Sequence, residues 1–310
     1  MTLLLTALDL CLAVILLWLT WAVLFSRDDF RAVVLFISLG LIMAMAWVRL
    51  TAPEVALAEA AIGAGISGAL LLSALPRLQQ TKNDPSVGKI PLFLLGLATL
   101  LFLVVTGGLL GITPPFRIGP GPLTAELMPL SGVSNQVTAV LLNFRSFDTL
   151  LELAVLLLAV VGIWSWGKER STGSGDGAKG PACPPAGPIT LTLTRGILPL
   201  AVLIAGYLAW IGDQAPGGAF QSGAVLGAAG VLLGLTVRPL TELFPQWLLR
   251  AVLVLGLAVF LLLAALPLAS GRLFFQYPPG YAGAFILAIE AAAALSIGLA
   301  LGLLPGGRPR

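Results

Sequence analysis

Long apolar runs separated by short polar breaks divide the chain into nine stretches. A helix needs about 20 apolar residues to cross the hydrocarbon of a bilayer, and runs of this length are typical of transmembrane helices. The sequence therefore predicts an all-α, polytopic membrane protein with about nine spans. The predicted spans are Leu3–Phe25, Ala32–Val48, Val55–Leu75, Ile90–Gly111, Phe147–Trp166, Leu191–Ile211, Phe220–Val237, Trp247–Leu268 and Tyr281–Leu304.

Composition agrees with this class and excludes several others. Apolar residues make up 58% of the chain and charged residues 10%, and the mean hydropathy is +1.02, far from the values of soluble domains. The basic residues are scattered and form no cluster of the kind that binds nucleic acid. There is no histidine, and the two cysteines have no ligand-like spacing, so we expect no metal centre and no cofactor. No nucleophile motif is present, and we do not expect an enzyme.

The lysines and arginines predict an orientation. With nine spans, 13 of the 17 fall on one side of the membrane and 4 on the other. Cytoplasmic loops are enriched in these residues. The N-terminus is therefore expected outside and the C-terminus in the cytoplasm.

Two connections differ from the rest and suggest a modular organisation. Residues 168–190 are rich in Gly, Ser, Ala and Pro and predict a flexible cytoplasmic linker. On either side we expect a three-helix module over 1–80, a two-helix module over 81–167 and a four-helix module over 191–310.

The second unusual connection, Ile112–Arg145, is predicted to be external. Five apolar residues recur in it at helical spacing, opposite three polar ones: Val133, Val137, Val140, Leu141 and Phe144 against Ser134, Asn135 and Thr138. This pattern predicts an amphipathic helix on the bilayer surface or on a partner. A short lid packed on the chain itself explains the pattern equally well.

Carboxylates within the spans are the candidate functional groups, because an acid in hydrocarbon is costly unless it has a partner or a role. Asp148 and Glu152 are four residues apart and share one helix face, where they can pass a proton or hold a cation. Arg145 precedes them and can tune either acid. For Asp148, a plain helix-capping role is an alternative.

Further acids need separate interpretations. Glu59 lies among small residues that allow a second helix to approach closely, which favours a buried, neutral or paired carboxylate. Glu54 follows a proline at a helix start, where an acid interacts favourably with the helix dipole. Glu290 is the deepest acid and a second candidate for a proton or ion site. Asp213 lies near a span end, as does Asp9, where either can reach water.

The segment Ala215–Gly223 is rich in glycine but does not have the pattern of a phosphate-binding loop. No Gly-Lys-Ser/Thr follows it, and no strand precedes it. It predicts a tight turn into a helix whose entry face is made of small residues.

Three motifs resemble one family. The segment Asp213–Gly223 resembles the signature of the MnhB-like subunit of Mrp-type multisubunit cation/proton antiporters, and of its counterpart in membrane-bound hydrogenases. The segment Asn143–Glu152 resembles a motif in the C-terminal part of the large antiporter subunit, which the hydrogenases encode as a separate MbhE-like subunit. The segment Ala52–Gly65 resembles the preceding, MbhD-like subunit. The three motifs follow the family's order and cover almost the whole chain.

The resemblance implies a fusion of three small subunits from a complex related to the membrane arm of respiratory complex I. Its partners would be large antiporter-like subunits and small NuoK-like subunits in a bacterial or archaeal cell (inner) membrane. Glu59, Asp148 and Glu152 would then lie on or beside an ion pathway. The signature positions at the helix entries would be Glu54, Asp213, Pro216, Gly217 and Gly218.

This chain departs from the family pattern at three positions. Asp213 replaces the usual histidine, Glu54 stands where aspartate is common, and Glu290 stands where the antiporter form has a small residue. These departures leave the identity of the cation open.

The functional hypothesis is a membrane subunit of a Mrp-type cation/proton antiporter that lines or couples a proton or sodium pathway. Two alternatives remain at this stage. One is a membrane-arm subunit of a redox-driven pump such as a membrane-bound hydrogenase, and the other is a structural spacer whose acids pair with partner helices.

Overall fold

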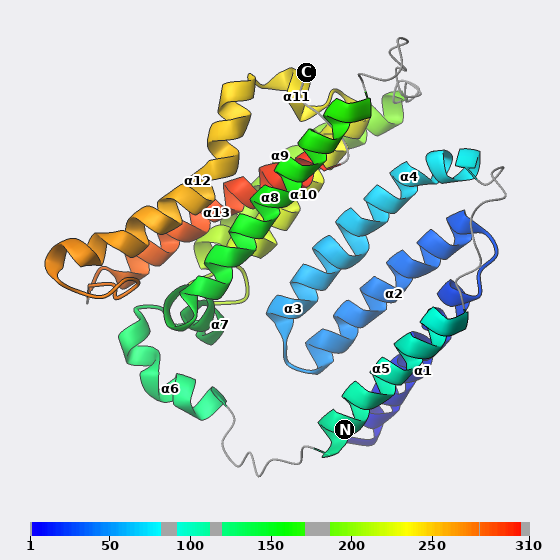
Figure 1. The fold of residues 1–310 in the computed structure, drawn as a ribbon, viewed down its shortest axis with the longest axis horizontal. Coiled ribbons are helices and arrows are strands. Elements are labelled where there is room, and N and C mark those ends of the chain that lie inside the picture. The colour runs from blue at the N-terminus through cyan, green and yellow to red at the C-terminus, as the bar shows by residue number, and fades with distance from the viewer. Residues whose placement is uncertain (1, 82–91, 112–119, 171–186, 279, 305–310) are drawn as a thin grey trace. The chain divides into compact units, whose positions relative to one another are not determined.

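The protein is described by a computed structural model that covers residues 2–81, 92–111, 120–170, 187–278 and 280–304. Within these ranges all regular structure is helical (Figure 1). The helices are α1 (Thr2–Leu24), α2 (Asp29–Arg49), α3 (Pro53–Ala58), the π-helix η1 (Glu59–Ile66), α4 (Ser67–Thr81), α5 (Leu92–Gly111), α6 (Pro120–Ser131), α7 (Gln136–Ala139), the π-helix η2 (Val140–Phe144), α8 (Ser146–Arg170), α9 (Pro188–Ile211), α10 (Ala219–Thr236), α11 (Leu240–Leu243), α12 (Gln246–Ala265), the 3-10 helix η3 (Leu266–Ser270) and α13 (Ala282–Leu303).

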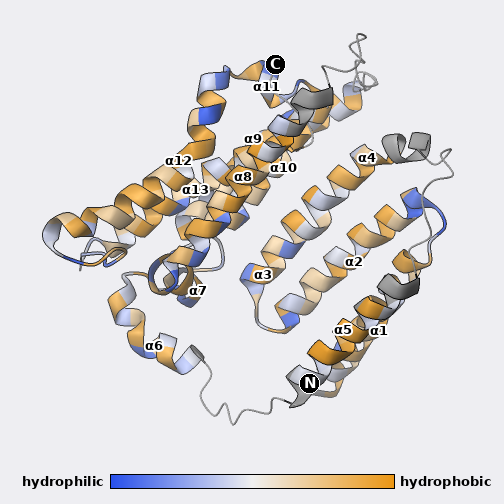
Figure 2. Cartoon of the chain, viewed as in Figure 1, coloured by the Kyte–Doolittle hydropathy of each residue, from blue (hydrophilic) through white to orange (hydrophobic). Residues whose placement is uncertain are grey.

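Eight helical segments among the described residues are long and apolar enough to cross a membrane. They are Leu3–Leu24, Asp29–Arg49, Pro53–Leu75, Ser146–Ser165, Pro188–Ile211, Ala219–Thr236, Gln246–Ser270 and Ala282–Leu303. The remaining predicted span, Ile90–Gly111, contains α5, a continuous apolar helix of 20 residues. Figure 2 shows hydrophobic residues around most of the helical surface, as expected for helices that are surrounded by lipid or by other helices. The prediction of an all-α, multi-pass membrane protein is confirmed, and the predicted orientation stays a prediction.

The chain divides into two compact units. One consists of Met1–Ser73 with Met128–Arg310, and the other is Ala74–Leu127. The first contains every residue discussed below. The predicted linker, 168–190, falls mostly on residues 171–186, outside the described residues, and the first part of the predicted external segment, 112–119, also lies outside them.

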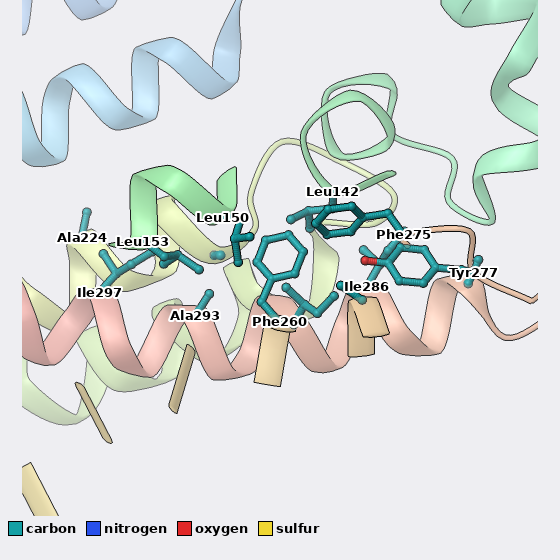
Figure 3. Close-up of a cluster of buried hydrophobic side chains, with 14 of the residues drawn as sticks. Leu142, Leu150, Leu153, Ala224, Phe260, Phe275, Tyr277, Ile286, Ala293 and Ile297 are labelled. Atoms are coloured by element: carbon teal, nitrogen blue, oxygen red, sulfur yellow. The ribbon is translucent and has the colours of Figure 1, made fainter. Parts of the chain in front are cut away.

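Helix α13 forms the centre of the first unit. It packs against α8, α9, α10 and α12. In the apolar 18-residue stretch of this span, 61% of the residues are buried, compared with 11% in the corresponding stretch of α1. Figure 3 shows its side chains Ile286, Ala293 and Ile297 among buried groups of neighbouring helices, including Phe260 of α12. The most buried span therefore belongs to the C-terminal part of the chain.

Small residues permit the close contact of α10 with α13. A Cβ atom added at Gly223 would lie 2.7 Å from Cβ of Ile297, and one added at Gly227 would lie 2.6 Å from Cβ of Leu301. The two glycines are four residues apart, so they form a continuous groove on one face of α10. The predicted small-residue entry face is therefore present, and it faces α13.

The N-terminal helices pack in a similar way but with fewer buried residues. Gly40 of α2 lies against Ala64 of η1, with 3.0 Å between Cβ of Ala64 and a Cβ added at Gly40. Between α1 and α2, Nε of Arg49 donates to Oδ1 of Asp9 at 2.7 Å, and its Nη2 donates to Oδ2 at 2.9 Å. The expectation that Asp9 simply reaches water is therefore incomplete, because its carboxylate is held by a two-pronged ion pair.

Candidate functional site

One cavity collects polar groups from segments far apart in the sequence. It has a volume of about 350 Å³ and is lined by residues of α3, η1, α7, η2, α8, α10 and α13 and of the turn before α10. Its polar side chains are Glu54, Thr138, Thr149, Glu152, Gln221 and Glu290. Among the described residues that line the cavity, three are acids and none is lysine or arginine. The chemistry of this lining favours a bound cation or proton.

Glu290 is the most buried of these acids. Its side chain comes from the middle of α13, and the residue is 2% exposed. Its Oε2 atom has no hydrogen-bond partner within the described structure, although it is completely buried. Its Oε1 atom lies close to the backbone of Gly212 and Gly218. A buried carboxylate without donors is costly to retain, so Glu290 is a strong candidate for a functional group.

The glycine turn before α10 is shaped by this carboxylate. Gly218 has φ +102°, and a Cβ atom there would lie 2.6 Å from Oε1 of Glu290. Its backbone N–H donates to the carbonyl of Leu208 at 2.8 Å, and a Cβ atom on Gly217 would lie 2.6 Å from that same carbonyl oxygen. Two glycines at this turn therefore allow the backbone to approach both the end of α9 and the buried acid.

The segment around α7 packs over the same region of the chain, in the manner of the lid alternative. The backbone N–H groups of Ser134 and Asn135 donate to the carbonyl of Asp213 at 2.9 and 2.8 Å. The Thr138 hydroxyl donates to the carbonyl of Gly212 at 2.5 Å. The expected polar face thus points towards the protein for Asn135 and Thr138, both of which are buried.

The lid is not the single amphipathic helix that the spacing predicts. Gly132 has φ +77°, and Asn135 caps a new helix by accepting from the N–H of Val137 at 2.8 Å. After one turn of α-helix the chain continues as the π-helix η2, in which the Arg145 N–H donates to the carbonyl of Val140 at 2.7 Å. Periodicity does not detect these breaks, and Gly132 lies against Ala282 and Gly283, which are distant in the sequence.

Glu54 connects the start of α3 to the lid and to α10. Its Oε1 accepts from Nδ2 of Asn135 at 3.4 Å, and its backbone carbonyl accepts from Nε2 of Gln221 at 3.3 Å. It lies in the first turn of α3, where the helix dipole favours an acid, as predicted. It also lines the cavity, which sequence spacing does not indicate.

The two acids of α8, Asp148 and Glu152, lie in different surroundings. Asp148, in the first turn, forms an ion pair with Arg145 at 2.5 Å, and both side chains are partly exposed to the surroundings. Glu152, one turn deeper, lines the cavity and also a second, mostly apolar groove of about 530 Å³ along α8. Asp148 lines only this groove. Glu152 therefore lies where the inner cavity and the outer face of α8 meet.

Glu59 lies outside the set of residues that line the cavity. It begins the π-helix η1, is half-buried, and rests against Gly63, one turn further along. Its neighbours Ala58 and Ile62 do line the cavity. π turns within helices are rare overall, and those that occur are often located at functional sites. Both π-helices, η1 and η2, contribute to this cavity, and neither was predicted from the sequence.

These features define a multi-pass helical membrane protein with an acid-lined cavity between its helices. The MbhD family model, which describes the D-type component of MBH, matches residues 14–80. The MnhB family model, described as a domain related to the MnhB subunit of Na+/H+ antiporter, matches residues 189–304. The chain therefore carries an MbhD-type segment followed by an MnhB-type domain, in the order that the motif resemblance implied.

Two known proteins are similar over longer stretches. The A-type component of the Na(+)/H(+) antiporter of Bacillus subtilis (strain 168) is 29% identical over 169 residues, which is 52% of this chain and 20% of that protein. A protein in the structure of the Mrp complex from Dietzia sp. DQ12-45-1b has a similar fold, with a TM-score of 0.73 and 21% identity over 96% of this chain and 34% of that one. The chain thus spans between a fifth and about a third of the length of these relatives.

Proposed function

We propose that this protein is a membrane subunit of a Mrp-type monovalent cation/proton antiporter complex in a bacterial or archaeal cell membrane. The observation that supports this most is the single cavity in which Glu54, Glu152 and Glu290 meet without a lysine or arginine in its described lining. The similarity to the Bacillus subtilis antiporter component and to a protein of the Mrp complex points the same way.

In this proposal the cavity is a section of the ion pathway. Glu152 joins the inner cavity to the groove along α8, so it exchanges a proton or cation between the two. Asp148 lines this groove, and its ion pair with Arg145 adjusts the local charge. Glu59 lies one turn from the cavity and acts beside the pathway.

The proposed role is that of a transporter subunit and not that of an enzyme, with other membrane subunits of the complex as its partners. Exposed apolar side chains on the outer face of α8, such as Leu151, Val155 and Leu158, fit contact with lipid or with partner helices. Large antiporter-like subunits and small NuoK-like subunits are the expected partners.

A second candidate is a membrane-arm subunit of a redox-driven pump. The MbhD-type segment at residues 14–80 specifically favours it, because that family model describes a component of MBH. Purification of the tagged chain in mild detergent, followed by mass spectrometry, separates the two candidates. Large antiporter-like subunits support the antiporter, co-purified iron–sulfur subunits support the redox pump, and recovery of the chain alone contradicts both.

The pathway itself is tested with Glu152→Gln in the assembled complex. We expect the rate of cation/proton exchange in membrane vesicles to fall at least tenfold, because a neutral amide cannot release a proton. A tenfold fall corresponds to an increase of about 1.4 kcal/mol in the activation free energy. Asp148→Asn is the matched control on the same helix face and should reduce exchange less. Normal exchange with Glu152→Gln, in a complex of unchanged subunit content, removes Glu152 from the pathway.

A further inference from the structure

We propose that Glu290 and Asp213 form a proton-binding site at the buried wall of the cavity, beneath the lid formed by residues 134–138. This inference rests on the proposed function and deepens it, because it assigns the proton as the ion held at this point. It also concerns two of the positions at which the chain departs from the family pattern.

The first argument is that both carboxylates have a buried oxygen atom without a partner. These atoms are Oε2 of Glu290 and Oδ1 of Asp213, and no hydrogen-bond donor of the described structure reaches either of them. Oε1 of Glu290 lies against Gly212, the residue before Asp213. A buried carboxylate oxygen without a donor is costly when it is charged, and a proton bound at Glu290 removes that cost.

The second argument concerns the other charged groups near α13. The cavity adds only Glu54 and Glu152, which are also acids. Of the helices packed against α13, α10 carries no charged residue, and α8 carries Asp148 and Glu152 near its start and Lys168, Glu169 and Arg170 at its opposite end. Arg195 of α9, Glu242 of α11 and Arg250 of α12 are absent from the described lining of the cavity. No basic group in this lining compensates the charge of Glu290.

The third argument favours a proton over an alkali metal ion. Hard cations bound entirely by protein take about six or more oxygen ligands. Three backbone carbonyls around the turn already accept hydrogen bonds: that of Gly212 from Thr138, that of Asp213 from Ser134 and Asn135, and that of Leu208 from Gly218. Within the described residues no group of three or more acids, cysteines or histidines is arranged to hold a metal ion. A proton requires none of these ligands.

The lid explains how such a site exchanges its proton in a controlled way. Residues 134–138 are held to the turn at 212–213 by four hydrogen bonds, with donors on the lid and backbone carbonyl acceptors on the turn. The cavity of about 350 Å³ has room for several water molecules, each of which occupies roughly 30 Å³ in the liquid. Glu290 and Glu152 both line this cavity, and Glu152 also lines the groove along α8, so water that enters the cavity would connect these sites.

Infrared difference spectroscopy of the full chain, purified with its co-eluting subunits in lipid nanodiscs, tests this site without measuring transport. The probe is a stepwise change of pH in sodium-free buffer. We expect a band of a protonated carboxyl group at neutral pH that shifts when glutamate is labelled with ¹³C. The label identifies a glutamate in the wild-type protein, so this arm does not depend on any variant folding.

Variants then locate the band. Glu290→Gln should abolish it, and Asp213→Asn should change its frequency because an amide replaces the neighbouring carboxylate. Glu54→Gln, which lines the same cavity, is the matched control and should leave the band in place.

The proposal is overturned by absence of the band, by its persistence in Glu290→Gln, or by its insensitivity to Asp213→Asn. It is also overturned if sodium ions remove the band at constant pH, because the site then binds an alkali cation. Because the spectrum does not depend on transport, this test of the proton site remains valid even if the antiporter assignment is wrong.

Discussion

The α1–α2 hairpin and the bundle around α13 each place a carboxylate in a membrane-spanning helix, but they treat it in opposite ways. Both oxygen atoms of Asp9 accept from the guanidinium of Arg49, in the fork geometry typical of arginine–carboxylate pairs. Glu290 is almost completely buried and has one oxygen atom without a partner in the described structure. An acid with a matched cation needs no further role, whereas an acid kept without one points to a function.

The two regions also differ in packing. In the apolar 18-residue stretch of each span, 11% of the residues are buried in α1 and 61% in α13. Side chains of α1 such as Leu10, Leu17 and Trp18 are largely exposed, so lipid or partner subunits cover them in the membrane. Substitutions should therefore be tolerated on much of α1 but not along α13, and three variants sharpen this comparison.

The largest effect on stability is expected for Gly218→Ala. The residue has φ +102°, and the added Cβ would lie 2.6 Å from Oε1 of Glu290. Backbone strain at positive φ together with overpacking should lower the free energy of unfolding by about 3 kcal/mol. Thermal unfolding of the purified protein, followed by tryptophan fluorescence, measures the change.

Gly271→Ala is the comparison for a positive-φ glycine without a close neighbour, although Gly271 has ψ 15° and Gly218 has ψ −165°. Gly271 has φ +73° but nothing within 4 Å of an added Cβ, so the cost should be about 1 kcal/mol. Equal losses in the two variants would mean that contact with Glu290 does not restrict position 218.

A smaller loss is expected for Gly227→Ala at the contact of α10 with α13. The added Cβ would lie 2.6 Å from Cβ of Leu301, and overpacking of this kind costs about 2 kcal/mol. Gly206→Ala on α9, where nothing lies within 4 Å, should leave the melting temperature unchanged or raise it. If both variants melt alike, the close approach of α10 to α13 is wrong.

The smallest effect is expected for Asp9→Asn, which leaves Arg49 without its carboxylate. Both side chains are partly exposed, so the melting temperature should fall by less than in Gly227→Ala. The double variant Asp9→Asn/Arg49→Gln should recover part of the loss, because it removes the unpaired charge. Transport should be retained in each, and loss of exchange at full stability would give Asp9 a role like the one proposed for Glu290.

Parts of the candidate site could be predicted from the sequence. The depth of Glu290 in its span and the shared face of Asp148 and Glu152 both follow from helical spacing. The turn at Gly217 and Gly218 was expected to be tight, and it is. What spacing could not predict is that Glu54 lines the cavity or that Arg49 pairs with Asp9, because these contacts join distant residues.

The sequence by itself determined the class of the protein, the positions of its spans and the acids they contain. In lipid, backbone groups must be satisfied within each segment, so long apolar runs have little choice but to form helices. Only the tertiary structure decided which acids meet. The link from Gln221 to Glu54 joins residues 167 positions apart, and the lid bond from Thr138 to Gly212 joins residues 74 apart. Such contacts depend on side-chain shape at close-packed interfaces, which hydropathy does not encode.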